Sequence, residues 1–433
     1  MLFTDIDLLT PDIDIIHHRW VGTEGAYVTY IGEAAPEDAS RFGRVVDGHG
    51  RLLMPAFYNT HAHTPMTLLR GYAEDQPLDK WLNDTVWPFE AKMRPDHDYW
   101  GCLLALAEMA RFGVVSCSDM YFETVLRARA VAEAGMKANL CDGGTMFHEG
   151  DEYDGLPVAE ANRELFGEWD GAADGRIKID MNIHAEYTTP ESMISRVVEE
   201  ARERGCGIQL HLSETRAEHE ECKGRHGGMT PTAYLESLGV FDVPVTAAHC
   251  VWVDDDDISI LAERGVNVSL NPASNMKLGS GFAPVTAMLD AGVPLSLGTD
   301  GAASNNTHNL LQSAYLLACS QKGNALDPAV VPVADVIRML TVGGAVAQGR
   351  DDCGTIEVGK RADLVVMDTD VPWMRPVHDM AVNLVYSANA ADVVMTVCDG
   401  QVVYDDGEWP TIDVERVAFE CDRCVGEVLA DLG

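Results

Sequence analysis

Eight short runs of apolar, mostly branched residues recur between about Gly43 and Asp300, and stretches with helical periodicity lie between most of them. Continuous apolar strands that alternate with amphipathic helices are typical of a parallel sheet whose faces are covered by helices. The eight predicted strands are Leu52 to Asn59, Val114 to Asp119, Lys137 to Cys141, Ile177 to His184, Gly207 to Leu212, Pro244 to His249, Val266 to Leu270 and Pro294 to Gly298. The clearest helical stretches are Trp100 to Arg111, Pro190 to Arg204 and Asp255 to Arg264.

A series of eight such units favours a closed barrel. A doubly wound open sheet shows the same alternation, but it seldom needs eight strands, and no Gly-x-Gly-x-x-Gly motif follows the first one. With 433 residues, the chain is long enough for a barrel together with a smaller unit. We therefore predict an α/β fold built on a (β/α)8 TIM barrel.

The two ends of the chain have a different pattern. AYVTYIG near the start, and DLVVMD and DVVMTVCDGQVVYDDGEW near the end, indicate short strands joined by Asp-Gly turns, which is an antiparallel signature. Neither end is long enough to bury a core of its own, so we predict that the ends pair into one small β-domain. The expected boundaries are residues 1–53 and 351–433 for this β-domain and tail, and 54–350 for the barrel.

The charge balance excludes several kinds of partner. Acidic residues outnumber basic ones by 69 to 31, so the net charge is −38, which repels both nucleic acids and anionic membranes. No apolar run approaches the roughly 18 residues of a spanning helix, and no secretory signal is readable. The 11 cysteines are scattered singly, and we interpret the Cys421/Cys424 pair as a feature of a helical tail. A reducing, cytoplasmic location is expected.

Five of the 14 histidines fall at or just after the carboxyl ends of the predicted strands. In a barrel these ends meet at one mouth, where active sites are built. Residues far apart in the sequence are therefore expected to converge there. The groups are His61 and His63 on the first strand, His184 on the fourth, His211 and the nearby Glu214 on the fifth, His249 on the sixth and Asp300 on the eighth.

This set predicts a metal site. His61 and His63 face the same way on an extended strand, so both can point at one ion. Together with His211 and Asp300 they form a shell of three imidazoles and one carboxylate, with a position left for water. Such a metal lowers the pKa of its bound water to around 7. We predict one divalent ion, Zn²⁺ in the first place, with Fe²⁺ or Mn²⁺ as alternatives that ligand type does not separate.

Three groups near the predicted metal can move protons. Glu214 is a candidate acid or base, and the alternative is a solvated carboxylate at a helix start, where Ser213 or Thr215 would cap. His249 can orient or deprotonate the attacking water, or be a hydrogen-bonded core histidine. Asp300 can bind the metal and accept a proton. The other histidines are interpreted as surface or packing residues, with His148 and His308 as further candidates for the mouth.

At this point the sequence resembles the amidohydrolase superfamily over nearly its full length, and within it the methylthioadenosine/S-adenosylhomocysteine deaminases. The motifs that carry the resemblance are MPAFYNTHAHTPM, HLSET, AAHC, NPASNMKLGSG, LGTDGAASNN and GTIEVGKRADLVVMD. The resemblance implies a barrel flanked by a β-sandwich from both termini, one metal ion and a homo-oligomer. It implies hydrolytic deamination of an adenine nucleoside to the inosine analogue, with release of ammonia.

The resemblance also implies roles for single residues. His61, His63, His211 and Asp300 would be the ligands, Glu214 would protonate the purine ring, and His249 would assist the attacking water. Glu90 would accept hydrogen bonds from ribose hydroxyls, Trp81 would be an apolar wall, and His184 would contact the nucleoside. Without this context, Trp81 would be a core residue and Glu90 an exposed helical charge.

One segment departs from the family pattern. Some relatives have arginines between strands three and four that can hold the carboxylate of the homocysteine arm, but residues 142–154 contain none. This favours 5′-methylthioadenosine, adenosine or 5′-deoxyadenosine over S-adenosylhomocysteine. Two alternatives stay open: the same chemistry on guanine, 8-oxoguanine, cytosine, a pterin or a triazine, and a barrel that has lost catalysis and serves as a binding subunit.

Overall fold

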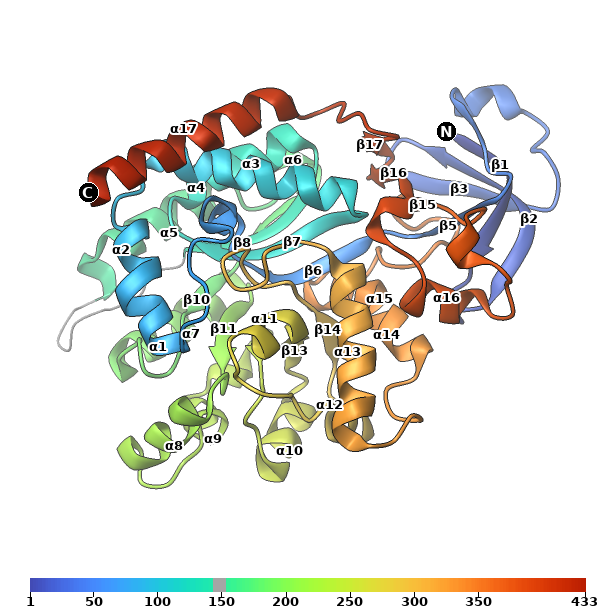
Figure 1. Cartoon of the computed structure of the whole chain (residues 1–433). Helices are drawn as coiled ribbons and strands as arrows, with labels where there is room; N and C mark the ends of the chain where they lie inside the picture. The colour runs from blue at the N-terminus through green and yellow to red at the C-terminus, as the bar shows by residue number, and fades with distance from the viewer. Residues whose placement is uncertain (143–152) are drawn as a thin grey trace.

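The computed structural model describes residues 1–142 and 153–433. Its centre is a set of parallel strands that alternate with helices (Figure 1). The strands are β6 (Phe57–Ala62), β7 (Val114–Tyr121), β8 (Lys137–Asp142), β9 (Ile177–Ile179), β10 (Met181–Ile183), β11 (Ile208–Leu212), β12 (Val245–His249), β13 (Asn267–Leu270) and β14 (Leu295–Leu297). The longer helices around them are α3 (Pro95–Arg111), α4 (Thr124–Ala134), α5 (Pro157–Glu168), α7 (Glu191–Arg204), α8 (Arg216–Arg225), α10 (Asp255–Arg264), α13 (Leu310–Ala325) and α14 (Val333–Leu340).

Within the described residues, ladders of hydrogen bonds group these strands into two parallel sheets, in the orders β6-β7-β8-β9 and β10-β11-β12-β13-β14. Only Asp180 separates β9 from β10, so one extended segment joins the sheets: its first half pairs with β8 and its second half with β11. On the other side, β14 lies beside β6, where the backbone N–H of Asp300 donates to the carbonyl of His61 at 2.9 Å. The α/β class with parallel strands is confirmed.

The predicted first strand is wrong in one respect. The apolar run from Leu52 to Asn59 is two strands, β5 (Arg51–Pro55) and β6, which belong to different sheets. The chain changes sheets at Ala56, whose N–H donates to Asp363 at 3.0 Å, whereas the N–H of Phe57 donates to Gly113 at 2.9 Å. Both strands are buried, so the apolar pattern of the sequence is continuous and does not indicate where one strand ends and the next begins.

Strands from both ends of the chain combine into one mixed sheet, seen in blue and orange-red at one end of the molecule (Figure 1). Its order is β17-β16-β15-β5-β1-β2-β3, with β4 paired to β1, and β15 joins the two ends by its antiparallel pairing with β5. The Asp399-Gly400 turn between β16 and β17 has positive φ at both residues, as the sequence predicts. The remaining strands are β1 (Leu2–Leu9), β2 (Ile15–Glu24), β3 (Tyr27–Gly32), β4 (Val45–Asp47), β15 (Leu364–Asp368), β16 (Val393–Cys398) and β17 (Gln401–Asp405).

The chain ends in helix α17 (Val414–Leu432), which packs along α3 (Figure 1). Cys421 and Cys424 are buried on this helix as free thiols, and the Cys421 thiol donates to the carbonyl of Trp100 at 3.4 Å. Both cysteines therefore contribute to packing, as interpreted from the sequence. Among the described residues, none of the helices has the length and apolar character needed to cross a membrane.

Candidate active site

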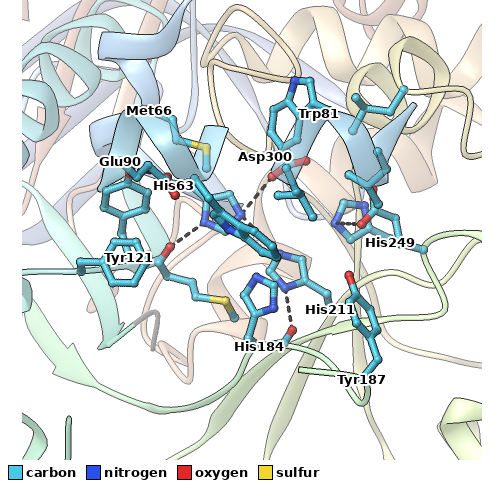
Figure 2. A pocket seen from close by; sticks show the side chains of 17 residues that line it. His63, Met66, Trp81, Glu90, Tyr121, His184, Tyr187, His211, His249 and Asp300 are labelled. Atoms are coloured by element: carbon cyan, nitrogen blue, oxygen red, sulfur yellow. Dashed lines mark hydrogen bonds and ion pairs between the residues drawn. The ribbon is translucent and has the colours of Figure 1, made fainter. Parts of the chain in front are cut away.

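The predicted strand-end residues lie together at one mouth of the parallel sheets. His61 lies in β6 and His63 directly follows that strand, while His211 and His249 lie in β11 and β12. Asp300 follows β14. All five are buried, with no more than 9% of any of them exposed. The close-up shows the imidazoles of His63, His211 and His249 and the Asp300 carboxylate turned toward one another (Figure 2).

Four of these side chains bring candidate ligand atoms close together. Oδ1 of Asp300 lies 3.4 Å from Nε2 of His61 and 3.2 Å from Nε2 of His63. The Nε2 atoms of His63 and His211 are 3.3 Å apart. Two overlapping groups, His61-His63-His211 and His61-His249-Asp300, each have their ligand atoms within 4.8 Å of one another. This spacing is suited to several atoms sharing one ion.

Hydrogen bonds to carbonyls fix the tautomers of two imidazoles. Nδ1 of His63 lies 2.6 Å from the carbonyl oxygen of Met120, and Nδ1 of His211 lies 2.7 Å from that of His184. Because a carbonyl only accepts, each Nδ1 carries the proton and each neutral ring presents an Nε2 lone pair to the centre. Among the described residues, the buried Nε2 of His61 has no hydrogen-bond partner, although it lies 3.4 Å from Oδ1 of Asp300. These unpaired acceptors fit a cation, and an imidazole held by a carbonyl is typical of a metal ligand.

Burial and the neighbouring groups shift the pKa values of the cluster. Burial lowers the pKa of His61 to about 4, and burial together with the neighbouring imidazoles lowers the pKa of His211 far below its usual value. Although burial opposes the shift, the Asp300 carboxylate raises the pKa of His63. Although burial opposes the shift, the imidazoles of His61 and His63 beside the carboxylate hold the pKa of Asp300 well below its usual range. The carboxylate is therefore ionised and the cluster attracts positive charge.

Asp300 is anchored by residues that the sequence did not single out. Its Oδ2 accepts hydrogen bonds from Ser274 at 2.6 Å and Ser304 at 3.0 Å, and its Oδ1 accepts one from the N–H of Gly301 at 2.9 Å. Both serines lie in quoted motifs, NPASNMKLGSG and LGTDGAASNN, but a serine within a motif does not reveal its partner. Together these donors orient the carboxylate toward the imidazoles.

Glu214 and His249 face each other across the cluster, with Oε2 and Nε2 3.8 Å apart. Nδ1 of His249 lies 2.8 Å from Oδ1 of Asn275, which directs its Nε2 inward. Glu214 is buried and not solvated, and burial raises its pKa. Thr215, one of the two residues considered as the helix cap, is the N-cap of α8: its hydroxyl oxygen accepts the backbone N–H of Glu218 at 3.1 Å. A carboxyl group with a raised pKa is suited to proton transfer.

These groups open into a cavity of about 660 Å³, a volume that includes space open to solvent. Glu90, Trp81 and His184 line it, as the resemblance implies. Burial raises the pKa of Glu90 to about 7 and lowers that of His184 to about 3. Trp81 is buried, with its Nε1–H donating to the carbonyl of Ala73 at 3.0 Å, so that its ring serves as a wall.

Tyr121 is a further cavity residue that sequence reasoning missed. Its hydroxyl donates to Oε1 of Glu90 at 2.6 Å, and the two side chains lie on the same side of the cavity (Figure 2). The predicted strand ended at Asp119, two residues short of the end of β7, so Tyr121 was not recognised as a strand-end residue. Met66, Met120 and Tyr187 also line the cavity.

Of the two further histidine candidates for the mouth, the described structure places only His308, and it does not support that candidate. His308 is buried behind β14, with Nδ1 3.1 Å from Oγ1 of Thr299, and it is not among the residues that line the cavity. His148 and most of the segment that lacks arginine lie outside the described residues.

Comparisons with known proteins agree with this geometry. A model of the amidohydrolase family matches residues 52–403. The chain is 40% identical to a 5-methylthioadenosine/S-adenosylhomocysteine deaminase of Dictyoglomus thermophilum over 99% of both chains. It is 40% identical to a 5′-deoxyadenosine deaminase of Methanosarcina acetivorans, over 98% of this chain and 96% of the relative. An adenosine deaminase from Xanthomonas campestris, solved with bound zinc, superposes with a TM-score of 0.91 at 31% identity, over 99% of this chain and 98% of the other.

Proposed function

The chain belongs to the amidohydrolase family, and we propose that it is a metal-dependent deaminase of adenine nucleosides. It is a hydrolase acting on C–N bonds, and it converts the 6-amino group to oxygen with release of ammonia. The observation that carries this conclusion is the convergence of three imidazoles and a carboxylate at 3.2–3.4 Å spacings, at a cavity that Glu214, His249 and Glu90 line. The family that the sequence motifs indicate is confirmed.

His61, His63, His211 and Asp300 would hold one divalent ion, with Zn²⁺ expected and Fe²⁺ or Mn²⁺ as alternatives. The outward-facing Nδ1 hydrogen bonds of His63 and His211 support this ligand set, because they leave both Nε2 atoms free for the ion. When bound, the ion supplies a Lewis acid that makes hydroxide available at neutral pH. Zinc in the Xanthomonas campestris relative favours zinc here.

The protein's own groups would carry the protons. Glu214, whose pKa is raised by burial, would donate to the purine ring nitrogen beside the amino group. His249 would take a proton from the attacking water at Nε2, since Asn275 occupies its Nδ1. Asp300 would be a second acceptor, and its hydrogen bonds to Ser274 and Ser304 would keep it facing the reacting centre.

The nucleoside would lie in the cavity between Trp81 and the metal cluster. Glu90 would accept hydrogen bonds from the ribose hydroxyls with the oxygen that Tyr121 leaves free. His184, neutral because of its low pKa, would contact the nucleoside through its uncharged ring. The names of the relatives support 5′-methylthioadenosine, adenosine, 5′-deoxyadenosine or S-adenosylhomocysteine as substrates, and the lack of arginine in residues 142–154 favours the three that have no terminal carboxylate.

The finer features of the fold are also proposals. The single Asp180 between the two sheets and the β6–β14 contact support a closed (β/α)8 barrel within residues 54–350. Residues 1–53 and 351–433 would form the flanking β-sandwich and tail. A small second core, which includes Phe3, Leu53 and Val366, supports a separate unit. We further propose a cytoplasmic homo-oligomer with no nucleic-acid or membrane partner.

The direct test is the reaction itself. Metal-loaded protein should change the ultraviolet absorbance of 5′-methylthioadenosine, adenosine or 5′-deoxyadenosine from the adenine to the hypoxanthine type and release ammonia in equal amount. If all three remain unchanged, the substrate assignment is wrong. Turnover of guanine, 8-oxoguanine, cytosine, a pterin or a triazine in parallel reactions would support the alternative heterocycles, and a bound metal without any turnover would support a binding subunit.

A further inference from the structure

Arg127 is completely buried beneath the active site, although it lies on helix α4 and lines no part of the cavity. It pairs with Asp119, which is equally buried, at 2.6 Å. A buried ion pair adds little stability compared with apolar residues of the same size. This pair lies at the carboxyl ends of β7 and β8, and its hydrogen bonds show which groups it positions there.

The Arg127 guanidinium donates to three backbone carbonyls at and just after the end of β7. Its Nε donates to the carbonyl of Phe122 at 2.9 Å, and its Nη atoms donate to the carbonyls of Asp119 at 3.1 Å and Tyr121 at 2.5 Å. A further bond at 2.7 Å reaches the carbonyl of Cys141 on β8. Since arginine has only five N–H donors in a fixed plane, these partners fix where both strand ends lie.

By binding the carbonyls of Asp119 and Tyr121, Arg127 also determines the direction of the Met120 carbonyl between them. Along a strand, carbonyls of successive residues point to opposite edges. With the oxygens of Asp119 and Tyr121 turned toward Arg127, the oxygen of Met120 faces the other edge, where it accepts the Nδ1–H of His63 at 2.6 Å. The guanidinium thereby helps to orient a metal-binding imidazole that it does not touch.

Asp119 extends the same control to the backbone beside His63. Its Oδ1 accepts the N–H of Thr64 at 2.7 Å, and its Oδ2 accepts the Thr64 hydroxyl, also at 2.7 Å. His63 is thus held on both sides, by its ring on Met120 and by its neighbour on Asp119. At the other end, Tyr121, whose carbonyl Arg127 holds, donates its hydroxyl to Glu90 (Figure 2).

We propose that Arg127 is a positioning residue that fixes the metal-binding His63 and the sugar-binding Glu90 at once, through the consecutive residues Asp119, Met120 and Tyr121. The inference rests on the proposed function, because it takes from there the metal-binding role of His63 and the sugar-binding role of Glu90. It predicts that loosening Arg127 weakens metal binding and nucleoside binding together, whereas an ion pair that only stabilises the fold would affect neither in the folded protein.

The test compares Arg127→Lys with Arg350→Lys. Arg350 is a matched control, since it is also buried and donates to backbone carbonyls, but at the opposite end of the strands, including Ala138 at 3.2 Å and Arg176 at 2.8 Å. Both variants should unfold at lower temperature. Only Arg127→Lys should lose metal to a competing chelator about 10- to 100-fold more readily, which is the range for residues that orient metal ligands.

A second measurement tests the effect of Arg127 on nucleoside binding through Glu90, in protein without metal. Binding of inosine to chelator-treated protein, measured by calorimetry, should be at least several-fold weaker in Arg127→Lys than in Arg350→Lys. If Arg127→Lys keeps metal affinity, inosine affinity and kcat/KM within about twofold of the wild type, the proposal is wrong. If that variant does not fold, Thr64→Val takes its place, and unchanged metal retention in Thr64→Val would equally contradict the proposal. Failure of the proposed function would be visible in the wild type, which would then bind neither metal nor inosine.

Discussion

The Nε2 atoms of His63 and His211 lie 3.3 Å apart, although the residues are 148 positions apart in the sequence. Both rings donate their Nδ1 protons to backbone carbonyls, so two lone pairs face each other. Two acceptors at this distance repel unless a cation or a proton lies between them. A pair held in this way from outside is therefore prepared for an ion before the ion binds.

Metal removal should lower stability in a concentration-dependent way. Because the ion binds the folded chain, it should stabilise that chain by about 2.7 kcal/mol at a free concentration 100 times its Kd. Thermal unfolding of chelator-treated protein should thus occur at lower temperature, with recovery on addition of Zn²⁺. Elemental analysis should give one ion per chain for the wild type and for His308→Gln, whose histidine lies behind β14, and a marked loss for His211→Asn. Full metal content in His211→Asn would contradict the ligand set.

Glu214→Gln should abolish proton transfer while it leaves the cavity intact. The amide has nearly the same shape but cannot donate and recover a proton, so kcat should fall by about 10²- to 10⁴-fold. Inosine affinity should change little, and metal content should stay at one ion per chain. Glu221→Gln, an exposed change on helix α8, which begins two residues after Glu214, is the matched control and should leave kcat unaltered. A Glu214→Gln enzyme with near-normal kcat would exclude Glu214 as the acid.

Glu90→Gln separates nucleosides from free bases. Loss of a charged acceptor for the ribose hydroxyls should weaken adenosine binding by about 1.5–3 kcal/mol. The penalty should disappear for 2′,3′-dideoxyadenosine, which has no hydroxyls to donate, and for adenine. Comparing kcat/KM for these substrates in the wild type and the variant gives the measurement. An equal loss for adenosine and its dideoxy analogue would show that Glu90 does not bind the sugar.

Tyr121→Phe should shift the pH dependence of nucleoside binding. Burial raises the pKa of Glu90 to about 7, and the Tyr121 hydrogen bond lowers it against that effect. Because the ionised carboxylate is the better acceptor, KM for adenosine should fall as the pH rises through the pKa of Glu90. Removing the hydroxyl should raise that pKa, so the fall in KM should occur at higher pH in the variant. Identical KM profiles would contradict this coupling.

The convergence of the candidate ligands could be predicted from the sequence because it follows from the topology of parallel strands alone. Parallel barrel strands end at one mouth, so His61, His211 and Asp300 needed only their strands to be recognised. Tyr121 was not predicted as a cavity residue because its strand extends two residues beyond the apolar run. The contact of Ser274 with Asp300 was not predicted because a serine in a sequence does not indicate which group its hydroxyl contacts in the folded chain. The division of β5 from β6 was equally hidden, since both strands are buried and their apolar pattern is continuous.

Lys137 should be important for stability and unimportant for catalysis. It is buried at the start of β8, away from the mouth, where it pairs with Asp363 and, at 2.8 Å, with Asp399 of the terminal sheet. Lys137→Met leaves the buried Asp363 carboxylate without its cation, which typically costs about 3–5 kcal/mol, whereas Asp399 keeps an ion pair with Arg361 at 3.4 Å. Urea unfolding should show this loss, whereas kcat, KM and metal content of the folded variant should equal those of the wild type.

Lys178→Met is the control for this prediction. It removes an amine that donates to the backbone carbonyls of Gln348 and Gly349, and the loss of stability should be smaller. Equal losses in the two variants would show that the buried ion pairs do not join the terminal sheet to the parallel strands more firmly than ordinary hydrogen bonds do.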